Sequence, residues 1–385
     1  MLILKLLFRN AFRNKLRTSL TILGITIAIL AFGLLRTLIS AWYAGVEASS
    51  ATRLVTRNAV SIVFPLPHFY KDKIYQVNGV KTVSYGTWFG GVYGDEKNFF
   101  ANFAVEPRSF LELYPEFVIP PDNKEAFLKD QKGCVIGKKL AAKFGWKVGD
   151  IVTLKGTIFL GNWDFVVRGI YHGRDKDTDE SQFFFHWAYL NEIQKKALPG
   201  WADKVGYYII GVTRAELAGD VAVALDQIFK NSLAETLTET EKAFQQGFVA
   251  MSGAIVMAIQ IVSFVVIFIM MAVVANTMAM TTRERFGEYA ILKTLGFRGG
   301  HIAVLIFGES LVITIIGCLL GVALTFPATK VISNELGTYF PVFNIGRETL
   351  FLSWVAALTI AFVAAVIPTR RAIKIRIADG LRRIG

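Results

Sequence analysis

Four long apolar stretches dominate the pattern of hydrophobic and polar positions along the chain. They occupy residues 20–42, 246–280, 301–327 and 350–367, and each has a basic segment at one end. An α-helix rises about 1.5 Å per residue, so about 20 apolar residues cross the hydrocarbon core of a bilayer. The pattern therefore predicts an integral membrane protein with four transmembrane α-helices that is embedded in a lipid bilayer.

The segment 1–19 has the pattern of an amphipathic helix. Its basic residues recur at every fourth position, as Lys5, Arg9, Arg13 and Arg17. Such a helix lies at a membrane surface, with its polar face toward the headgroups. A secretory signal peptide is the alternative, but the following apolar stretch is too long for its core. We therefore expect a cytoplasmic amphipathic helix followed by an uncleaved first span.

The charge distribution predicts the topology. Residues 1–19, 281–300 and 368–385 together hold 15 basic and 3 acidic residues, and this difference equals the net charge of +12 of the whole chain. Short segments rich in Lys and Arg remain in the cytoplasm during insertion. Both termini, including a basic tail at 368–385, are therefore expected inside the cell. The membrane topology explains the basic excess, so we expect no nucleic acid among the partners of this chain.

The residues between the first two spans predict a large α+β extracytoplasmic domain at 43–245. Short strand-like runs alternate there with helical segments. The expected strands are 59–64, 99–105, 151–154, 165–171 and 206–212, and the expected helices are 109–114, 137–144 and 215–229. The uncharged run 243–282 is about twice as long as a span requires. Helical stalks at 40–56 and 236–247 are therefore expected to join the domain to the membrane, and an outer loop is expected at 328–349.

The sequence offers no pattern typical of a catalytic, nucleotide or metal site. The nearest approach to a phosphate-binding loop, GCVIGKK at 133–139, lacks the spacing and the final hydroxyl. A run of three aspartates resembles the start of a calcium loop, but Glu180 stands where glycine is needed. We expect no enzymatic activity, cofactor or metal in this chain by itself. Cys134 lies in the expected outer domain and Cys318 within the third apolar stretch, so no disulfide is expected.

Four segments together resemble the FtsX/MacB (type VII) family of ABC transporter permeases. The segment 276–302, NTMAMTTRERFGEYAILKTLGFRGGHI, is similar to the family signature. The matching residues are Arg283, Arg285, Glu288, Leu292, Leu295 and Gly296, with Lys293 where the family often has Arg. The segments 13–29, 134–154 and 368–382 resemble the family's opening helix, an outer-domain motif and its closing segment. The resemblance covers essentially the whole chain.

The resemblance implies a function. Permeases of this family work with a cytoplasmic ABC ATPase, here a separate subunit that would hold ATP and magnesium. They act as two copies, and homodimer and heterodimer both stay open. The implied function is transmission of ATPase motion to a MacB-like periplasmic domain in the bacterial inner membrane, for export or extraction of an antibiotic, lipid or lipoprotein. A periplasmic adaptor or substrate protein is a further expected partner. The alternative is an FtsX-like module that controls cell-wall hydrolases without transport, and an autonomous membrane enzyme is a more distant one.

The segment 281–300 is the expected cytoplasmic coupling helix. Its mixed charges and its end at Leu295-Gly296 are typical of a short helix between two spans. We expect it to dock on the ATPase, with the signature residues as contacts. The alternative is that its charges only anchor the segment at the lipid surface.

Three residues of the third span are expected to serve helix packing or gating. Glu309 is a carboxylate about two turns into the span, where a charge is costly unless it faces protein or water. For Glu309 we favour a hydrogen bond to another transmembrane helix over a role in a gate or a subunit contact. Gly317 and Gly321 form a Gly-x-x-x-Gly pair that permits close approach of another helix.

Overall fold

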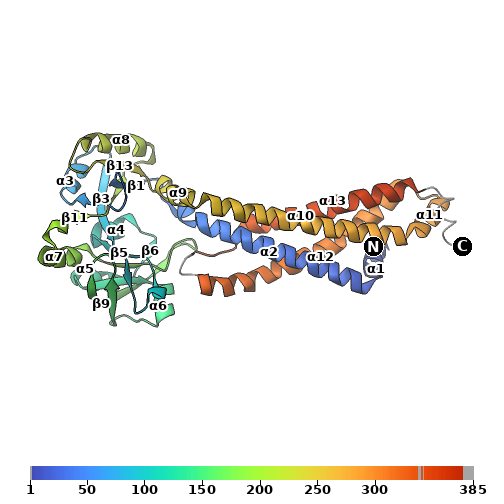
Figure 1. Ribbon diagram of the computed structural model, residues 1–385, viewed down its shortest axis with the longest axis horizontal. Coiled ribbons are helices and arrows are strands. Elements are labelled where there is room, and N and C mark those ends of the chain that lie inside the picture. Colours follow the sequence, from blue (N-terminus) through green and yellow to red (C-terminus); the bar gives the residue numbers. More distant parts are fainter. Residues whose placement is uncertain (1, 337–339, 341, 376–385) are drawn as a thin grey trace. The chain divides into compact units, whose positions relative to one another are not determined.

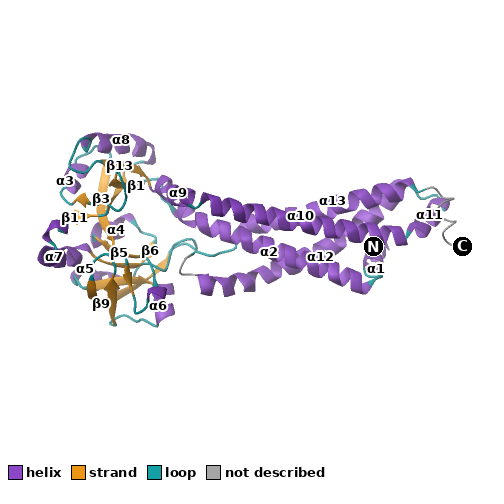
Figure 2. Ribbon diagram, in the orientation of Figure 1, coloured by secondary structure: helices purple, strands orange, loops and turns teal. Residues whose placement is uncertain are grey.

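The computed structural model describes residues 2–336, 340 and 342–375. The chain divides into two compact units, which we call the helical bundle and the sheet domain. The helical bundle comprises Met1–Ala41, Gly253–Glu335 and Phe343–Gly385. The sheet domain comprises Trp42–Ser252 and Leu336–Val342. Among the described residues the strands are confined to the sheet domain (Figures 1 and 2).

The bundle is built from helices whose apolar faces pack on one another. They are α1 (Leu2–Ala11), α2 (Lys15–Ala48), α10 (Gly253–Glu284), α11 (Phe286–Thr294), α12 (Gly299–Leu336) and α13 (Arg347–Lys374). Helix α13 packs against α10, and its alanines Ala357, Ala361 and Ala364 are buried. Small residues let membrane helices approach closely. Helices α2, α10, α12 and α13 are long and apolar enough to cross a membrane, which confirms the four predicted spans.

The bundle helices extend beyond the apolar stretches that predict them. Helix α12 continues past Pro327 to Leu336, and α13 continues past Pro368 to Lys374. A proline removes one N–H donor, but membrane helices tolerate it where neighbouring helices pack around the site. The expected outer loop at 328–349 and the expected tail at 368–385 are therefore partly helical, and residues 376–385 lie outside the described residues.

The expected single helix at 1–19 is divided in two. Helix α1 ends at Ala11, and α2 begins at Lys15. The Thr18 hydroxyl donates a hydrogen bond to the carbonyl of Ala11 and closes the corner between the two helices. A carbonyl left free at the end of α1 is thereby satisfied from the first turn of α2.

The uncharged run 243–282 is interrupted as well. Helix α9 (Glu241–Met251) ends before Ser252, whose N–H bonds the carbonyl of Val249 in a tightened last turn. Helix α10 starts at Gly253. Expected helical residues at 53–56 and 236–240 belong instead to the antiparallel strands β1 and β13, with Leu54 opposite Thr240. Buried and more exposed residues alternate at the start of TLTET, a pattern that favours a strand over a helix.

The sheet domain is built on a large mixed sheet with the strand order β13-β1-β12-β3-β5-β10-β7-β9-β8-β4. Pairing is antiparallel except between β5 and β10 and between β7 and β9. The strands are β1 (Arg53–Asn58), β2 (Leu66–Pro67), β3 (Val80–Trp88), β4 (Gly91–Val92), β5 (Asn102–Val105), β6 (Phe117–Val118), β7 (Gly133–Gly137), β8 (Ile151–Gly156), β9 (Gly161–Gly173), β10 (Phe183–His186), β11 (Lys204–Val205), β12 (Tyr207–Val212) and β13 (Thr236–Thr240).

Short helices cover the sheet. They are α3 (Tyr70–Tyr75), α4 (Pro107–Leu113), α5 (Pro121–Lys129), α6 (Lys138–Phe144), α7 (Trp187–Ala197), α8 (Ala218–Ile228) and α9, with the 3₁₀ turns η1 (Glu96–Asn98), η2 (Pro199–Trp201) and η3 (Ala215–Leu217). The mixture of strands and helices confirms the predicted α+β class. The expected strand at 59–64 is wrong, because these residues follow β1 as a loop in which Val60 and Val63 are 80% and 79% exposed.

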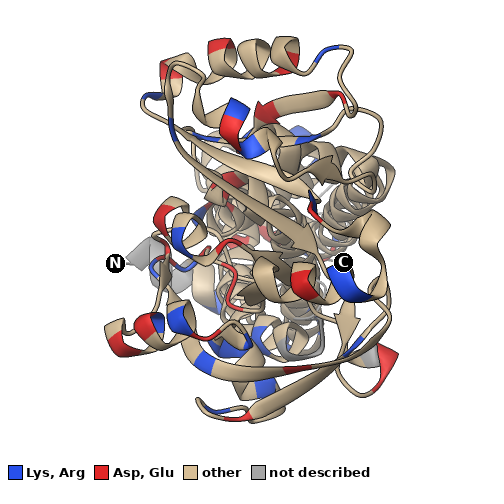
Figure 3. Ribbon diagram, turned by 90° about the vertical axis from the view of Figure 1, so that its left-hand side faces the viewer, with Lys and Arg blue, Asp and Glu red and all other residues tan. Residues whose placement is uncertain are grey.

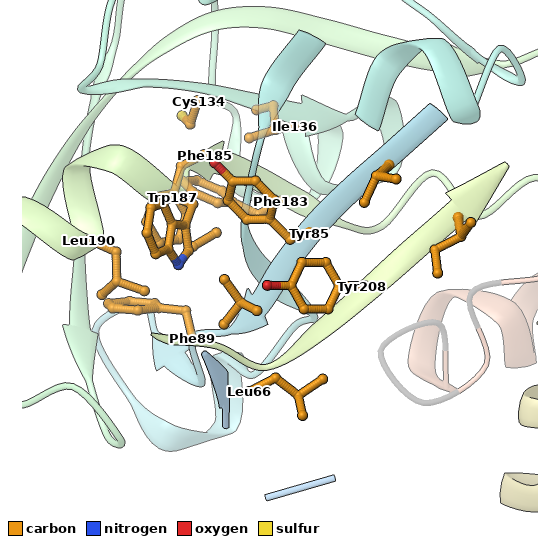
Figure 4. Close-up of a cluster of buried hydrophobic side chains, with 14 of the residues drawn as sticks. Leu66, Tyr85, Phe89, Cys134, Ile136, Phe183, Phe185, Trp187, Leu190 and Tyr208 are labelled. Carbon is orange, nitrogen blue, oxygen red and sulfur yellow. The ribbon is translucent and has the colours of Figure 1, made fainter. Parts of the chain in front are cut away.

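Aromatic side chains fill the core of the sheet domain (Figure 4). In β10 the side chains of Phe183 and Phe185 enter the core drawn in Figure 4, whereas Phe184 enters a second cluster with Phe110 and Tyr171. Successive residues of a strand point to opposite faces, so this run of three phenylalanines is buried on both sides of the sheet.

Charged residues are mixed in sign on the sheet domain. Positions of Lys and Arg and positions of Asp and Glu are interspersed along the ribbon in the view of Figure 3.

Candidate functional site

The short helix α11 forms a defined turn between α10 and α12. It ends in a Schellman motif, in which the N–H of Phe297 bonds the Leu292 carbonyl at 3.0 Å and the N–H of Gly296 bonds the Lys293 carbonyl at 3.1 Å. Gly296 has φ +92°, a conformation that favours glycine. Leu295-Gly296 is therefore the helix stop that its sequence indicates.

Arg285, directly before α11, is turned into the bundle. Its Nη1 lies 2.8 Å from Glu309 Oε2, and its Nε lies 3.1 Å from Glu288 Oε2. The Arg285 side chain is 11% exposed and that of Glu309 is 5% exposed. The start of α11 is thereby fixed to the interior of α12, and the carboxylate of Glu309 has its counter-charge.

The same charged network reaches the corner between α1 and α2. Arg13 in that corner pairs with Glu288. The Nη1 and Nη2 nitrogens of Arg17 donate to Glu284 at 2.8 and 2.7 Å. Burial alone would raise the pKa of the Glu288 carboxyl, but the hydrogen bonds from Arg13 and Arg285 outweigh it and hold the pKa below its usual value. Glu288 is therefore ionised at neutral pH and links the corner to α11.

Lys293 holds the other side of α11. Its Nζ donates to the carbonyls of Ile373 and Ile375, both at 2.7 Å, at the end of α13. A cation near the last carbonyls of a helix satisfies free acceptors and complements the helix dipole. Leu292 packs partly buried against the core of the bundle. Both side chains therefore attach α11 to the bundle.

The structure divides the signature residues into two groups. Arg285, Glu288, Leu292 and Lys293 contact the bundle, whereas Arg283 and Leu295 face away from it, with Leu295 71% exposed. The outward face also includes two apolar residues that the sequence analysis missed, Ile291 and Phe297, which are 45% and 44% exposed. The spacing of four between residues 291 and 295 is the signal that marks them as one helix face. We call Ile291 of α11, together with Leu295 and Phe297 just after its end, the outward face of α11.

Gly317 and Gly321 lie where α12 packs against α2. A Cβ at Gly317 would lie 2.7 Å from the Cβ of Ile25, and one at Gly321 would lie 2.8 Å from the Cβ of Ile29. Thr26 adds a hydrogen bond from its hydroxyl to the Gly317 carbonyl at 3.3 Å. The pair therefore serves packing between two helices of the same chain.

A second charged cluster, within the sheet domain, was also missed by the sequence analysis. Arg53 Nε and the N–H of Ser50 both bond Glu241 Oε2, at 2.7 and 2.8 Å. Arg53 Nη2 pairs with Glu116 at 2.7 Å, and the Tyr114 hydroxyl donates to Glu241 at 3.0 Å. The Arg53 and Glu241 side chains are 7% and 8% exposed. This Arg53–Glu241 clamp fastens the start of α9 to the residues that follow α2.

Comparisons with known proteins match both parts of the chain to ABC transporter permeases. Residues 18–228 match the MacB-like periplasmic core domain, and residues 260–377 match the FtsX-like permease C-terminal region. The chain is 26% identical over 399 aligned positions to an uncharacterised ABC transporter permease of Methanocaldococcus jannaschii, covering 97% of this chain and 96% of that protein.

Two solved structures are also similar to part of the chain. The extracellular domain of the noncanonic ABC-type transporter YknZ from Gram-positive bacteria is 12% identical, with a TM-score of 0.36, over 49% of this chain and 100% of that one. A domain of a putative permease protein from Porphyromonas gingivalis is 13% identical, also with a TM-score of 0.36, over 50% of this chain and 92% of that one.

Proposed function

Because the chain belongs to the FtsX/MacB-type family of ABC transporter permeases, we propose that it transmits the motion of a separate cytoplasmic ATPase to an extracytoplasmic domain. The continuity of α2 carries this proposal. One helix runs from Lys15, beside the Arg17–Glu284 pair, to Ala48, just before the Arg53–Glu241 clamp. Its 34 residues make a rod of about 50 Å, longer than the hydrocarbon core of about 30 Å.

The orientation follows from the basic segments. Lys and Arg are concentrated at the end of the bundle that carries α1, α11 and the end of α13. The positive-inside rule places that end in the cytoplasm and the sheet domain outside the cell or in the periplasm. The membrane would be the plasma membrane, which is the inner membrane in a cell with two.

In this arrangement α11 is the coupling helix. Its outward face would enter a groove of the ATPase, because apolar side chains exposed at a membrane protein's aqueous end favour a protein partner. The signature residues Arg285, Glu288 and Lys293 would act differently, by fixing α11 to α12, to the α1–α2 corner and to α13. ATP and magnesium would be held by the ATPase, and this chain would have no catalytic activity by itself.

The load would be hydrophobic or amphiphilic, such as an antibiotic, lipid or lipoprotein. Several hydroxyls buried in the spans donate to carbonyls of their own helix, as Thr314 does to Ser310, which supports a load that needs no polar passage through the bundle. Motion of the outer domain would then move the load. A second permease copy, identical or not, and a periplasmic adaptor or substrate protein would complete the assembly.

Mass spectrometry of the complex tests this proposal. The full chain, tagged at its C-terminus, is extracted from native membranes in mild detergent, and the proteins that co-purify are identified. A subunit with a phosphate-binding loop in about equal amount is expected. Its absence in several detergents would contradict the proposal. Recovery of a cell-wall hydrolase or its activator in place of a load would favour the FtsX-like role without transport.

A further inference from the structure

A polar cavity opens at the surface of the helical bundle, where the α1–α2 corner meets the end of α10 and the first part of α12. Its volume is about 300 Å³, which is at the lower end for small-ligand sites. Arg13, Lys15, Arg17 and Arg285 line it together with Glu284 and Glu309. All of these residues belong to the helical bundle.

The lining has an excess of positive charge. Arg285 is neutralised by Glu309 at 2.8 Å, and Arg17 by Glu284 at 2.7 Å. Arg13 shares the carboxylate of Glu288 with Arg285 and keeps a 65% exposed side chain. Lys15 has no hydrogen-bonding or ionic partner among the described residues. The cavity is therefore built to accept an anion.

The surroundings of the cavity place this anion at a membrane surface. Lys15 is followed by Leu16 and Leu20, which are 73% and 60% exposed on α2. On the other side of the corner Phe8 and Phe12 are 44% and 36% exposed. Basic residues next to outward apolar side chains at the start of a span mark the level of the lipid headgroups. An anionic group bound here would therefore lie at the level of the lipid headgroups.

We propose that this cavity binds the phosphodiester of an anionic phospholipid. Arg13 and Lys15 would hold the phosphate oxygens, because guanidinium and ammonium groups are the side chains that bind phosphate best. Met278 and Ile313 supply apolar parts of the wall. A bound headgroup would give Lys15 a counter-charge and so stabilise the corner that contacts α11. This assignment does not depend on the proposed transport role.

Native mass spectrometry of the full chain in neutral detergent tests the site. The chain is titrated with short-chain phosphatidylglycerol, with phosphatidylcholine, and with phosphatidylglycerol in the presence of inorganic phosphate. We expect tighter binding of phosphatidylglycerol, because the choline cation would be repelled. Lys15→Gln should weaken that binding about fivefold, and Lys15→Arg should preserve it. The matched control Arg9→Gln removes a charge from α1 outside the cavity and should change binding less than about twofold.

Three results would overturn the proposal. Equal binding of the two lipids would show that net charge is not recognised. An equal loss in Lys15→Gln and Arg9→Gln would indicate diffuse attraction instead of a site. Displacement of the lipid by inorganic phosphate at a similar concentration would identify the ligand as a free anion and not a headgroup.

Discussion

Arg285 Nη1 and Glu309 Oε2 form a buried ion pair at 2.8 Å between the residue that precedes α11 and the interior of α12. Neither side chain is more than 11% exposed. A charge in a membrane helix is costly by itself, and the pair makes each group tolerable by supplying the other. The signature residue Arg285 is thus bonded to a carboxylate 24 positions later in the chain.

Removing one partner of this pair should destabilise the bundle strongly. Arg285→Met leaves the buried Glu309 carboxylate without its partner, which typically costs about 3 to 5 kcal/mol. Glu309→Gln should cost less, because Arg285 keeps its 3.1 Å pair with Glu288. The double variant should recover part of this loss, and the control Glu348→Gln, at an exposed carboxylate on α13, should be near neutral. Unfolding of the full chain in detergent measures all four. Additive losses in the double variant would contradict direct pairing.

The Arg53–Glu241 clamp should control the stability of α9. Arg53→Met leaves Glu241 and Glu116 without their shared guanidinium, and we expect about 3 to 5 kcal/mol of local destabilisation. Hydrogen exchange of the α9 amides in the full chain reports it. Arg57→Met is the matched control, because Arg57 lies on the same strand with a 3.3 Å pair to Glu239 and is 23% exposed. Similar exchange in both variants would exclude a special role for the clamp.

Gly317 should not tolerate even a methyl group. In Gly317→Ala the new Cβ would stand 2.7 Å from the Cβ of Ile25, and such overpacking costs about 1 to 3 kcal/mol. Gly300→Ala on the same helix has nothing within 4 Å of the added Cβ and should gain up to about 1 kcal/mol from helix propensity. Thermal unfolding in detergent distinguishes the two variants, because the melting temperature should fall in Gly317→Ala and rise in Gly300→Ala. A stabilised Gly317→Ala would place the α2–α12 contact elsewhere.

Hydropathy and signature residues were enough to predict the membrane architecture and the position of α11. Long apolar runs and the positive φ at Gly296 are local properties, and local properties can be read from sequence. The break at Ser252 could not be predicted, because neither charge nor proline marks it. The strand at 53–58 was also missed, since Arg53 interrupts its apolar pattern and is stabilised there by partners distant in sequence, such as Glu241.

The direction in which each signature residue points was the part of the site that sequence did not provide. All of them lie within one short segment, and their spacing does not reveal which face meets the bundle. Arg285 turns inward because Glu309, in another helix, neutralises it, and Lys293 turns toward α13 because free carbonyls end that helix. Both partners are distant in the sequence, so only tertiary structure separates the contacting residues from the exposed ones.

The outward face of α11 should determine ATPase binding if the chain is the permease proposed here. Leu295→Asp places a charge at a 71% exposed apolar position and should reduce recovery of the ATPase at least about tenfold, the effect of about 1.4 kcal/mol. The fold should be unaffected, because Leu295 contacts little of the bundle. Co-purification from detergent-extracted membranes measures the loss, and the melting temperature checks the fold.

Two variants separate docking from a general effect of charge. Leu160→Asp makes the same change at an 84% exposed leucine in the sheet domain and should leave ATPase recovery unchanged. Arg285→Met should also reduce recovery, but together with stability, because it acts by releasing α11 from α12. If Leu295→Asp kept full ATPase recovery while Arg285→Met lost it at unchanged stability, the contact surface would instead include the signature arginine, and α11 would have to turn when the partner binds.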